Sequence, residues 1–246
     1  MLKVDIENIT IRNNNNTHLL LKKIDFELSE GKVYSIIGKN GTGKSTLIKS
    51  LTMLLNENIF SVNGNVIWDN KNISDYDADE LLQIRKNKIR YVFQDAANSF
   101  DPLKTFRYYF DNSFAGKNKI AELLEYFLLP DYNEISRLYS YEVSGGMAQR
   151  LSMILAFLAE PQLIILDEPT TGIDYAISNL LLLKIRKFTE EENKIVLIVT
   201  HDIMFSEKVS DELALLSEGT LTQFITKEEF FAKQGIDLLD SIKEVQ

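Results

Sequence analysis

The sequence predicts an α/β fold in which a mostly parallel sheet carries helices on both faces. Short apolar runs at residues 33–37, 89–93, 163–166 and 195–199 have the length and composition of buried strands. Segments with helical spacing alternate with these runs, and this alternation is typical of a parallel sheet covered by helices. A chain of 246 residues is long enough for one large domain or for a domain with an insert.

The first third of the chain is predicted to place strands on either side of a glycine-rich loop. Residues 4–11 alternate apolar and polar side chains, which indicates a strand with one solvated face. Residues 19–28 are expected to form a second strand, and a helix over residues 45–55 follows the loop. We interpret Asn63-Gly64 as a turn that leads into an edge strand at residues 66–68.

The rest of the chain is predicted to be largely helical between its buried strands. Residues 95–141 interrupt the alternation with a loop and an aromatic-rich stretch, and we interpret this segment as an insert. The C-terminal residues 227–246 are expected to form helices that Gly235 breaks. Further helices are expected at residues 77–88, 119–129, 144–159 and 175–188.

Composition and charge narrow the classes of function. The net charge is −9, and the basic footprint that nucleic-acid binders usually show is not visible overall. The chain has no cysteine, which excludes disulfides, thiolate zinc sites and cysteine-ligated iron–sulfur clusters. Apolar runs are far shorter than the roughly 18 residues that a membrane helix needs, and no signal-peptide pattern follows Met1. We therefore expect a cytosolic protein that docks to a membrane if it serves one.

A glycine-rich loop matches the phosphate-binding pattern G-x-x-x-x-G-K-[ST] and follows the predicted strand 33–37. Its glycines let backbone N–H groups point at phosphate oxygens, and the next helix adds its positive N-terminal end. Lys44 is expected to reach the β- and γ-phosphates, and Ser45 to bind Mg²⁺. A glycine-rich turn that only caps a helix is the alternative. The predicted nucleotide-binding residues of this P-loop NTPase core are Gly38, Lys39, Asn40, Gly41, Thr42, Gly43, Lys44, Ser45 and Thr46.

Two acidic residues, Asp167 and Glu168, follow the apolar strand 163–166. Because the carboxyl ends of parallel strands open onto the ligand crevice, Asp167 is expected to face the Mg²⁺ that Ser45 holds. Glu168 is a candidate to orient or deprotonate the attacking water. Taken alone, the pair could equally be two acids that start a loop before Pro169.

Gln94 and His201 each follow a predicted strand. The uncharged amide of Gln94 can contact both Mg²⁺ and the attacking water, and a hinge there would let the nucleotide state move the insert. His201 is a candidate to bond the γ-phosphate and to hold the catalytic geometry. A solvated loop glutamine and a structural histidine are the alternatives.

Ser144-Gly145-Gly146 opens a predicted helix. Serine is a good N-cap, and the two glycines leave backbone N–H groups bare, so the segment can form a second anion site. The alternative is a plain helix cap. The segment would be a second phosphate-recognising surface, and it has no obvious use in its own subunit. We therefore expect it to complete the ATP site of a partner.

Taken in order, these motifs resemble those of the ATP-binding subunits of ABC transporters. The resemblance covers nearly the whole chain and implies ATP hydrolysis with ATP and Mg²⁺ at a head-to-tail dimer interface. Each ATP would lie between the phosphate loop of one subunit and the signature of the other, formed here by Ser144, Gly145, Gly146 and Met147. The motifs that carry it are the phosphate loop, Gln94, Val143 to Met147, Asp167-Glu168, the D-loop Thr171-Gly-Ile-Asp174 and the switch residue His201.

The resemblance also implies how the chain is divided. All 246 residues would form one nucleotide-binding domain with an N-terminal antiparallel β subdomain and an inserted α-helical subdomain. Residues 1–94 and 160–225 would form the catalytic core with the β subdomain. Residues 95–159 would form the helical subdomain with the signature, and residues 226–246 a C-terminal helical tail.

Finer features are similar to the branch that imports peptides and nickel: Phe93-Gln-Asp95 with Ser99-Phe-Asp-Pro102, Tyr139 to Arg150, and Asp167 to Thr171. This similarity implies a peripheral subunit on the cytoplasmic face of the membrane that energises import of peptides or of nickel and other metal chelates. Its partners would be two transmembrane permease subunits and an extracytoplasmic solute-binding protein, with no nucleic acid. Met147 matches one of the two paralogous ATPases that this branch commonly pairs, which favours a heterodimer over a homodimer.

The chain departs from this branch near Asn13, where the usual aromatic that stacks on adenine is missing. Two other functions are alternatives. An exporter ATPase shares all the catalytic residues. A soluble ABC-type switch that acts on ribosomes or DNA usually has two cassettes, a coiled-coil insert or basic extensions, and the net charge of −9 argues against it.

Overall fold

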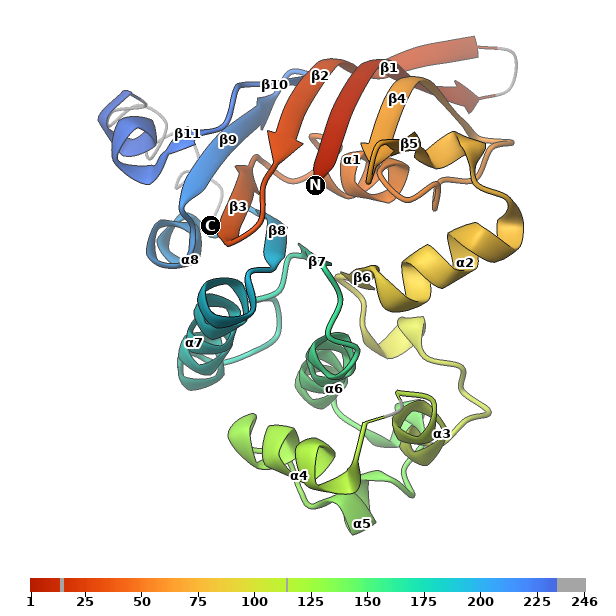
Figure 1. Cartoon of the computed structure of the whole chain (residues 1–246), viewed down its shortest axis with the longest axis vertical. Coiled ribbons are helices and arrows are strands. Elements are labelled where there is room, and N and C mark those ends of the chain that lie inside the picture. Colours follow the sequence, from red (N-terminus) through yellow and green to blue (C-terminus); the bar gives the residue numbers. More distant parts are fainter. Residues whose placement is uncertain (14–15, 114, 234–246) are drawn as a thin grey trace.

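The chain folds around a larger mixed sheet, a smaller antiparallel sheet and an inserted group of helices (Figure 1). The computed structural model describes residues 1–13, 16–113 and 115–233. The larger sheet contains β3 (Lys32–Ile37), β6 (Ile89–Val92), β7 (Leu163–Asp167), β8 (Ile195–Thr200), β9 (Glu212–Ser217), β10 (Thr220–Leu221) and β11 (Ile225–Thr226).

The strand order β10-β9-β3-β8-β7-β6 gives the larger sheet a parallel centre. All pairs from β9 to β6 are parallel, whereas β10 and β11 pair with β9 in antiparallel fashion. The side chains of β7 and β8 are buried throughout, as both faces of a parallel sheet require. The predicted α/β fold with a mostly parallel sheet is confirmed.

The smaller sheet contains β1 (Leu2–Asn13), β2 (Asn16–Leu28), β4 (Phe60–Trp68) and β5 (Lys71–Asn72) in the order β2-β1-β4-β5. Every pairing in it is antiparallel. Its alternating pattern buries one face against the larger sheet, and Trp68, which is 2% exposed, lies in that shared core. The sheet is the antiparallel β subdomain that the family resemblance implies.

The predicted turn at Asn63-Gly64 is wrong, because both residues lie inside β4. Gly64 pairs with Ile6 of β1 at a register shift, and its φ of 132° is open to glycine but not to residues with a Cβ. A Cβ built on Gly64 would lie 2.3 Å from the carbonyl oxygen of Asp5. The glycine therefore permits a β-bulge with close strand contact, and it does not end a strand.

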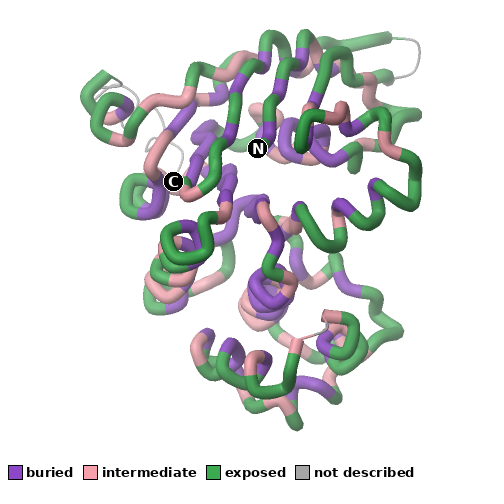
Figure 2. The backbone as a smooth tube through the Cα atoms, in the orientation of Figure 1, coloured by how far each residue is buried: buried purple, intermediate pink, exposed green. Residues whose placement is uncertain are grey.

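Helices cover both faces of the larger sheet. On one face, α1 packs in the core between the two sheets, and on the other α6 and α7 share a core with the inserted helices. Figure 2 shows buried backbone concentrated in the central strands and in α6. The helices are α1 (Lys44–Ser50), α2 (Ala78–Asn87), α3 (Phe106–Asp111), α4 (Lys117–Tyr126), α5 (Tyr132–Ile135), α6 (Gly145–Leu158), α7 (Tyr175–Glu192) and α8 (Ile203–Val209). Single-turn 3₁₀ helices occur at Ile73–Asp75, Ala97–Ser99 and Ser140–Glu142.

Several boundaries in the structure differ from the predicted ones. The helix expected to reach residue 55 ends at Ser50, where Arg85 donates hydrogen bonds to the carbonyl oxygens of Thr52 and Met53. Helix α7 runs beyond the predicted residue 188 to Glu192, and α8 and β9 were not predicted. Residues 227–233 are helical, whereas Gly235 and the rest of the predicted tail lie outside the described residues.

Among the residues that the structure describes, no helix combines the length and the apolar character that crossing a bilayer requires.

Candidate functional site

The glycine-rich loop links β3 to α1 at the carboxyl edge of the larger sheet. Gly41 and Gly43 have φ values of 80° and 96°, which the loop needs in order to curl. The Lys44 ammonium folds back over this loop and donates hydrogen bonds to the carbonyl oxygens of Gly38 at 2.7 Å and Lys39 at 3.1 Å. The loop is thus already curled around the end of the Lys44 side chain.

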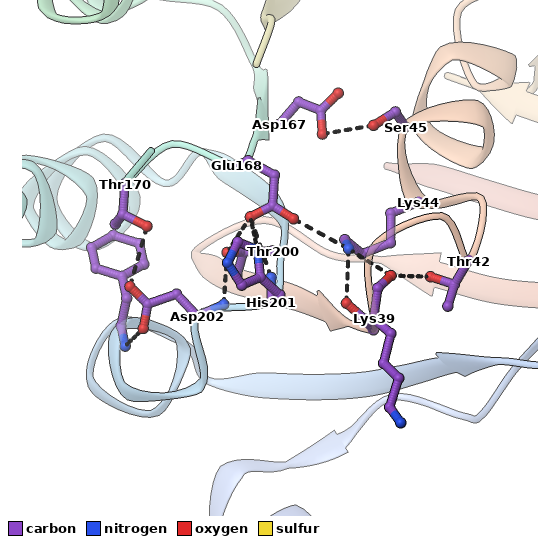
Figure 3. Close-up of polar contacts among 12 residues, drawn as sticks. Lys39, Thr42, Lys44, Ser45, Asp167, Glu168, Thr170, Thr200, His201 and Asp202 are labelled. Carbon is purple, nitrogen blue, oxygen red and sulfur yellow. Dashed lines mark hydrogen bonds and ion pairs between the residues drawn. The ribbon is translucent and has the colours of Figure 1, made fainter. Parts of the chain in front are cut away.

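Asp167 at the end of β7 faces the start of α1 (Figure 3). Ser45 donates a hydrogen bond of 3.0 Å to Asp167 Oδ1, and Tyr91 donates one of 3.2 Å to Oδ2. Burial raises the pKa of Asp167, although the hydrogen bonds from Ser45 and Tyr91 oppose that shift. A cation close to this carboxylate would offset the cost of burying its charge.

Glu168 lies against the other side of the phosphate loop, where three elements meet its carboxylate (Figure 3). Lys44 Nζ is 3.2 Å from Glu168 Oε1, while Oε2 lies 2.8 Å from the Thr200 hydroxyl and 2.9 Å from His201 Nδ1. Burial raises the pKa of Glu168, but the hydrogen bonds from Thr200 and His201 and the charge of Lys44 outweigh burial and lower it overall. Glu168 is consequently ionised at neutral pH.

The backbone of Glu168 adopts a left-handed conformation with φ of 48°, which costs a non-glycine residue about 1 kcal/mol. Its N–H donates to the carbonyl oxygen of Val199 in β8, and this bond holds the turn in place. The Oε1 atom accepts no hydrogen bond from the described residues, although it contacts Lys44 as an ion pair. That oxygen therefore keeps hydrogen-bonding capacity that the described residues do not use.

Gln94 lines the same cavity as Ser45 and Asp167. The cavity has a volume of about 480 Å³ and extends from the phosphate loop to the loop that follows β6. A hydroxyl, a carboxylate and an amide oxygen around one cavity form the hard oxygen set that suits Mg²⁺. The donor set therefore fits the ion that the sequence analysis expects.

The Ser144 segment lies apart from this cavity. Ser144 caps α6, since its hydroxyl oxygen accepts a 3.2 Å hydrogen bond from the N–H of Met147. Gly145 is exposed, and a Cβ built on it would meet nothing within 4 Å. A Cβ built on Gly146 would lie 2.8 Å from the carbonyl oxygen of Gly172. The segment therefore presents an open face at Gly145 and packs against the 171–174 loop at Gly146.

Asp174 is exposed and lies at the start of α7. Its Oδ1 accepts a 2.9 Å hydrogen bond from the N–H of Ile177, which makes it the N-cap of that helix. Asp174 follows Gly172, whose carbonyl oxygen would lie 2.8 Å from a Cβ built on Gly146 of the Ser144 segment. The Asn13 side chain, where the missing aromatic was noted, lies outside the described residues.

Sequence reasoning missed Tyr91 and Thr200, which hold the two carboxylates. Thr200 ends β8 directly before His201, so a hydroxyl at the carboxyl end of a buried strand was a usable signal. Tyr91 lies in β6 three residues before Gln94, and nothing local distinguishes it from a packing aromatic.

Two curated relatives have names that refer to transport, and one of these names specifies import. The oligopeptide transport ATP-binding protein OppD of Lactococcus lactis subsp. cremoris (strain SK11) is 30% identical over 219 residues. The match covers 85% of this chain and 64% of that protein, so the chain spans less than two thirds of its length. The metal-staphylopine import system ATP-binding protein CntD of Staphylococcus aureus (strain NCTC 8325 / PS 47) is 28% identical over 237 residues, which cover 93% of this chain and 87% of that protein.

A solved structure agrees with the fold. It is a dimeric ATP-binding cassette in a post-hydrolysis state bound to ADP and phosphate. Its TM-score to this chain is 0.79 at 26% identity, with 92% of this chain and 99% of that chain covered. Residues 21–171, which include the phosphate loop, the Ser144 segment and both acids after β7, match the ABC transporter family. The chain belongs to the ABC transporter family.

Proposed function

We propose that this chain is the ATP-hydrolysing subunit that energises a multi-subunit ABC importer, converting ATP and water to ADP and phosphate. The observation that carries the proposal is the pair of contacts across the site. Lys44 meets Glu168 and Ser45 meets Asp167, so both acids after β7 touch the phosphate loop. Gln94 lies on the same cavity, and His201 bonds Glu168.

In this proposal the γ-phosphate of ATP replaces Glu168 as the partner of Lys44. Residues Gly38 to Thr46 cradle the phosphates with their backbone N–H groups. The released Oε1 of Glu168 then orients the attacking water or accepts its proton, since the lowered pKa keeps the carboxylate ionised. Thr200 holds the opposite oxygen, and His201 is placed to bond the γ-phosphate.

Mg²⁺ would be held by Ser45, Gln94 and Asp167, with Asp167 binding it directly or through a water. The oxygen donors around the 480 Å³ cavity support this assignment. When bound, the ion neutralises charge on the β- and γ-phosphates. The protein's own contribution is to hold the donors in place, and the hydrogen bonds from Ser45 and Tyr91 already orient Asp167.

The signature residues Ser144, Gly145, Gly146 and Met147 serve the ATP of a second ATPase subunit. Their separation from the cavity within this chain and the exposure of Ser144 and Gly145 support a role in trans. Asp174, in the 171–174 loop that meets Gly146 through Gly172, would belong to the same dimer interface. Met147 favours a paralogous partner, so the proposed assembly is a heterodimer with two composite ATP sites.

The chain would divide into a core with the β subdomain (residues 1–94 and 160–225), a helical subdomain (residues 95–159) and a C-terminal tail (residues 226–246). The proposed partners are two transmembrane permease subunits and an extracytoplasmic solute-binding protein, without nucleic acid. The chain would be peripheral, on the cytoplasmic face of the membrane. The proposed cargo is peptides or nickel and other metal chelates, supported by the names of the oligopeptide and metal-staphylopine relatives.

The test is ATP-dependent transport by the complete assembly in sealed vesicles, with labelled peptide or nickel chelate supplied at the face of the solute-binding protein. An importer accumulates the cargo from that face only when ATP is present on the opposite face. Transport in the other direction would assign the chain to an exporter. ATP hydrolysis that no permease subunit influences would contradict a transport role.

A further inference from the structure

Tyr91 lies in β6, the strand next to the one that ends at Asp167. In the parallel pair of β6 and β7, Tyr91 is opposite Ile165, two residues before Asp167. Side chains alternate between the two faces of a strand, so Tyr91, Ile165 and Asp167 share one face of the sheet. From that face the Tyr91 hydroxyl donates its 3.2 Å hydrogen bond to Asp167 Oδ2.

The hydroxyl reaches Asp167 from outside the proposed metal cavity. In the described part of the chain, the residues that line this cavity include Ser45, Gln94 and Asp167 but not Tyr91. Ser45 donates to Oδ1, so Tyr91 takes the other oxygen of the carboxylate. Tyr91 therefore supports a proposed metal-binding residue and is not itself placed to bind the ion.

Packing fixes the ring that carries this hydroxyl. The ring packs against the apolar core between the two sheets, and its centroid lies 4.3 Å from that of Phe93. Phe93 in turn lines the metal cavity directly before Gln94. A ring packed in this way keeps its hydroxyl aimed at Asp167 at little further cost in side-chain entropy.

Asp167 needs such support because its side chain is only 2% exposed. A buried charge is costly unless hydrogen bonds satisfy it. Hydrogen-bond partners behind a metal-binding carboxylate also fix its orientation and raise the affinity of the site for the ion. A tyrosine hydroxyl is protonated at neutral pH, so it can supply the donor that the second carboxylate oxygen requires.

We propose that Tyr91 is a positioning residue that sets the Mg²⁺ affinity of the site by holding Asp167. This inference rests on the proposed Mg²⁺–ATP site, and it adds a residue that touches neither the ion nor the nucleotide. Tyr91→Phe is the variant that tests it, because it removes the hydroxyl and keeps the packed ring.

The experiment measures binding of an ATP analogue with a non-hydrolysable imido bridge to the purified chain by calorimetric titration, once with Mg²⁺ and once with EDTA. The ratio of the two affinities reports on the metal site and does not depend on ATP hydrolysis. The matched control is Tyr126→Phe, which removes a tyrosine hydroxyl that donates a 2.9 Å hydrogen bond to the carbonyl oxygen of Leu180. Thermal unfolding without nucleotide verifies that each variant is folded.

The wild type should bind the analogue more tightly with Mg²⁺ than with EDTA. Tyr91→Phe should reduce this ratio by about 10- to 100-fold, the usual effect of losing a hydrogen-bond partner behind a metal ligand, and should leave the affinity in EDTA unchanged. Tyr126→Phe should behave like the wild type. In a chain that already carries Asp167→Asn, Tyr91→Phe should have no further effect on the ratio, because Tyr91 acts through that carboxylate.

An unchanged ratio in folded Tyr91→Phe would overturn the proposal. An equal loss of affinity with Mg²⁺ and with EDTA would also overturn it, since that result is what a merely structural role predicts. Additive effects of Tyr91→Phe and Asp167→Asn would do the same. A wild-type chain that binds the analogue equally with Mg²⁺ and with EDTA would instead contradict the proposed Mg²⁺ site, and this inference with it.

Discussion

Replacing Glu168 with glutamine removes a buried charge that Lys44 contacts at 3.2 Å. The side chains of these residues are only 4% and 5% exposed, so water does little to compensate for the loss. Breaking one partner of a buried ion pair costs about 3–5 kcal/mol. The glutamine keeps an amide oxygen for Thr200, and Lys44 keeps two backbone acceptors, so we expect the lower end, about 3 kcal/mol. The melting temperature should then fall by about 6–12 °C in the absence of nucleotide.

The destabilisation by the same substitution should largely disappear once ATP is bound. The γ-phosphate supplies the negative charge that Lys44 has lost, so Mg²⁺–ATP should restore most of the melting temperature. Hydrolysis should fall by about 10²- to 10⁴-fold, the usual contribution of a general base. The assays are scanning calorimetry with and without Mg²⁺–ATP, and phosphate release by the assembled complex.

The matched control is Glu190→Gln, which breaks the exposed pair with Arg186 and should change stability by less than about 1 kcal/mol. The reasoning is refuted if Glu168→Gln hydrolyses ATP at the wild-type rate. A nucleotide-free melting temperature equal to that of the wild type would refute the buried-pair argument separately.

Three further perturbations follow from the same geometry. Lys44→Ala should abolish nucleotide binding, and an unchanged affinity for a fluorescent ATP analogue would contradict the phosphate-loop assignment. Gly146→Ala should lower ATP turnover in the assembled complex by tenfold or more, about 1.4 kcal/mol or more, because its Cβ would lie 2.8 Å from the carbonyl oxygen of Gly172. Gly145→Ala is the matched variant, because a Cβ at that position would have no atom within 4 Å. If its turnover also falls, the signature needs a bare backbone; if its turnover is unchanged, the signature needs only space. Finally, the wild type should lose its stability advantage over Glu168→Gln as the pH falls below about 4.3. The reason is that a carboxylate with a lowered pKa loses its stabilisation as it is protonated. A constant difference in melting temperature down to about pH 3 would contradict this prediction.

The sequence predicted an element correctly where the residues that form its pattern also stabilise the element. Asp77 was expected to start a helix, and in the structure it forms a capping box with Glu80 at the start of α2. The buried strands before Asp167 and His201 were likewise predicted within one residue, because apolar runs of that length are typical of a parallel sheet. The same strands placed both site residues at one edge of the sheet.

The sequence failed where a distant contact decides the local conformation. Asn63-Gly64 has the composition of a turn, yet Gly64 lies in a bulge because β1 approaches its backbone closely. Helix α1 ends at Ser50, and just beyond it Arg85, from α2, donates hydrogen bonds to the carbonyl oxygens of Thr52 and Met53, a contact that the local sequence does not reveal. The support that Tyr91 gives to Asp167 was equally invisible, since it joins side chains 76 residues apart.

The most direct test of the central claim is cargo uptake and phosphate release measured together, in vesicles that contain the chain with its permease subunits, second ATPase and solute-binding protein. We predict that cargo stimulates phosphate release, that uptake requires ATP, and that Glu168→Gln abolishes both activities while ATP remains bound. Phosphate release that cargo does not stimulate, or uptake that persists in the Glu168→Gln complex, would contradict the assignment of this chain as the energising subunit of an importer.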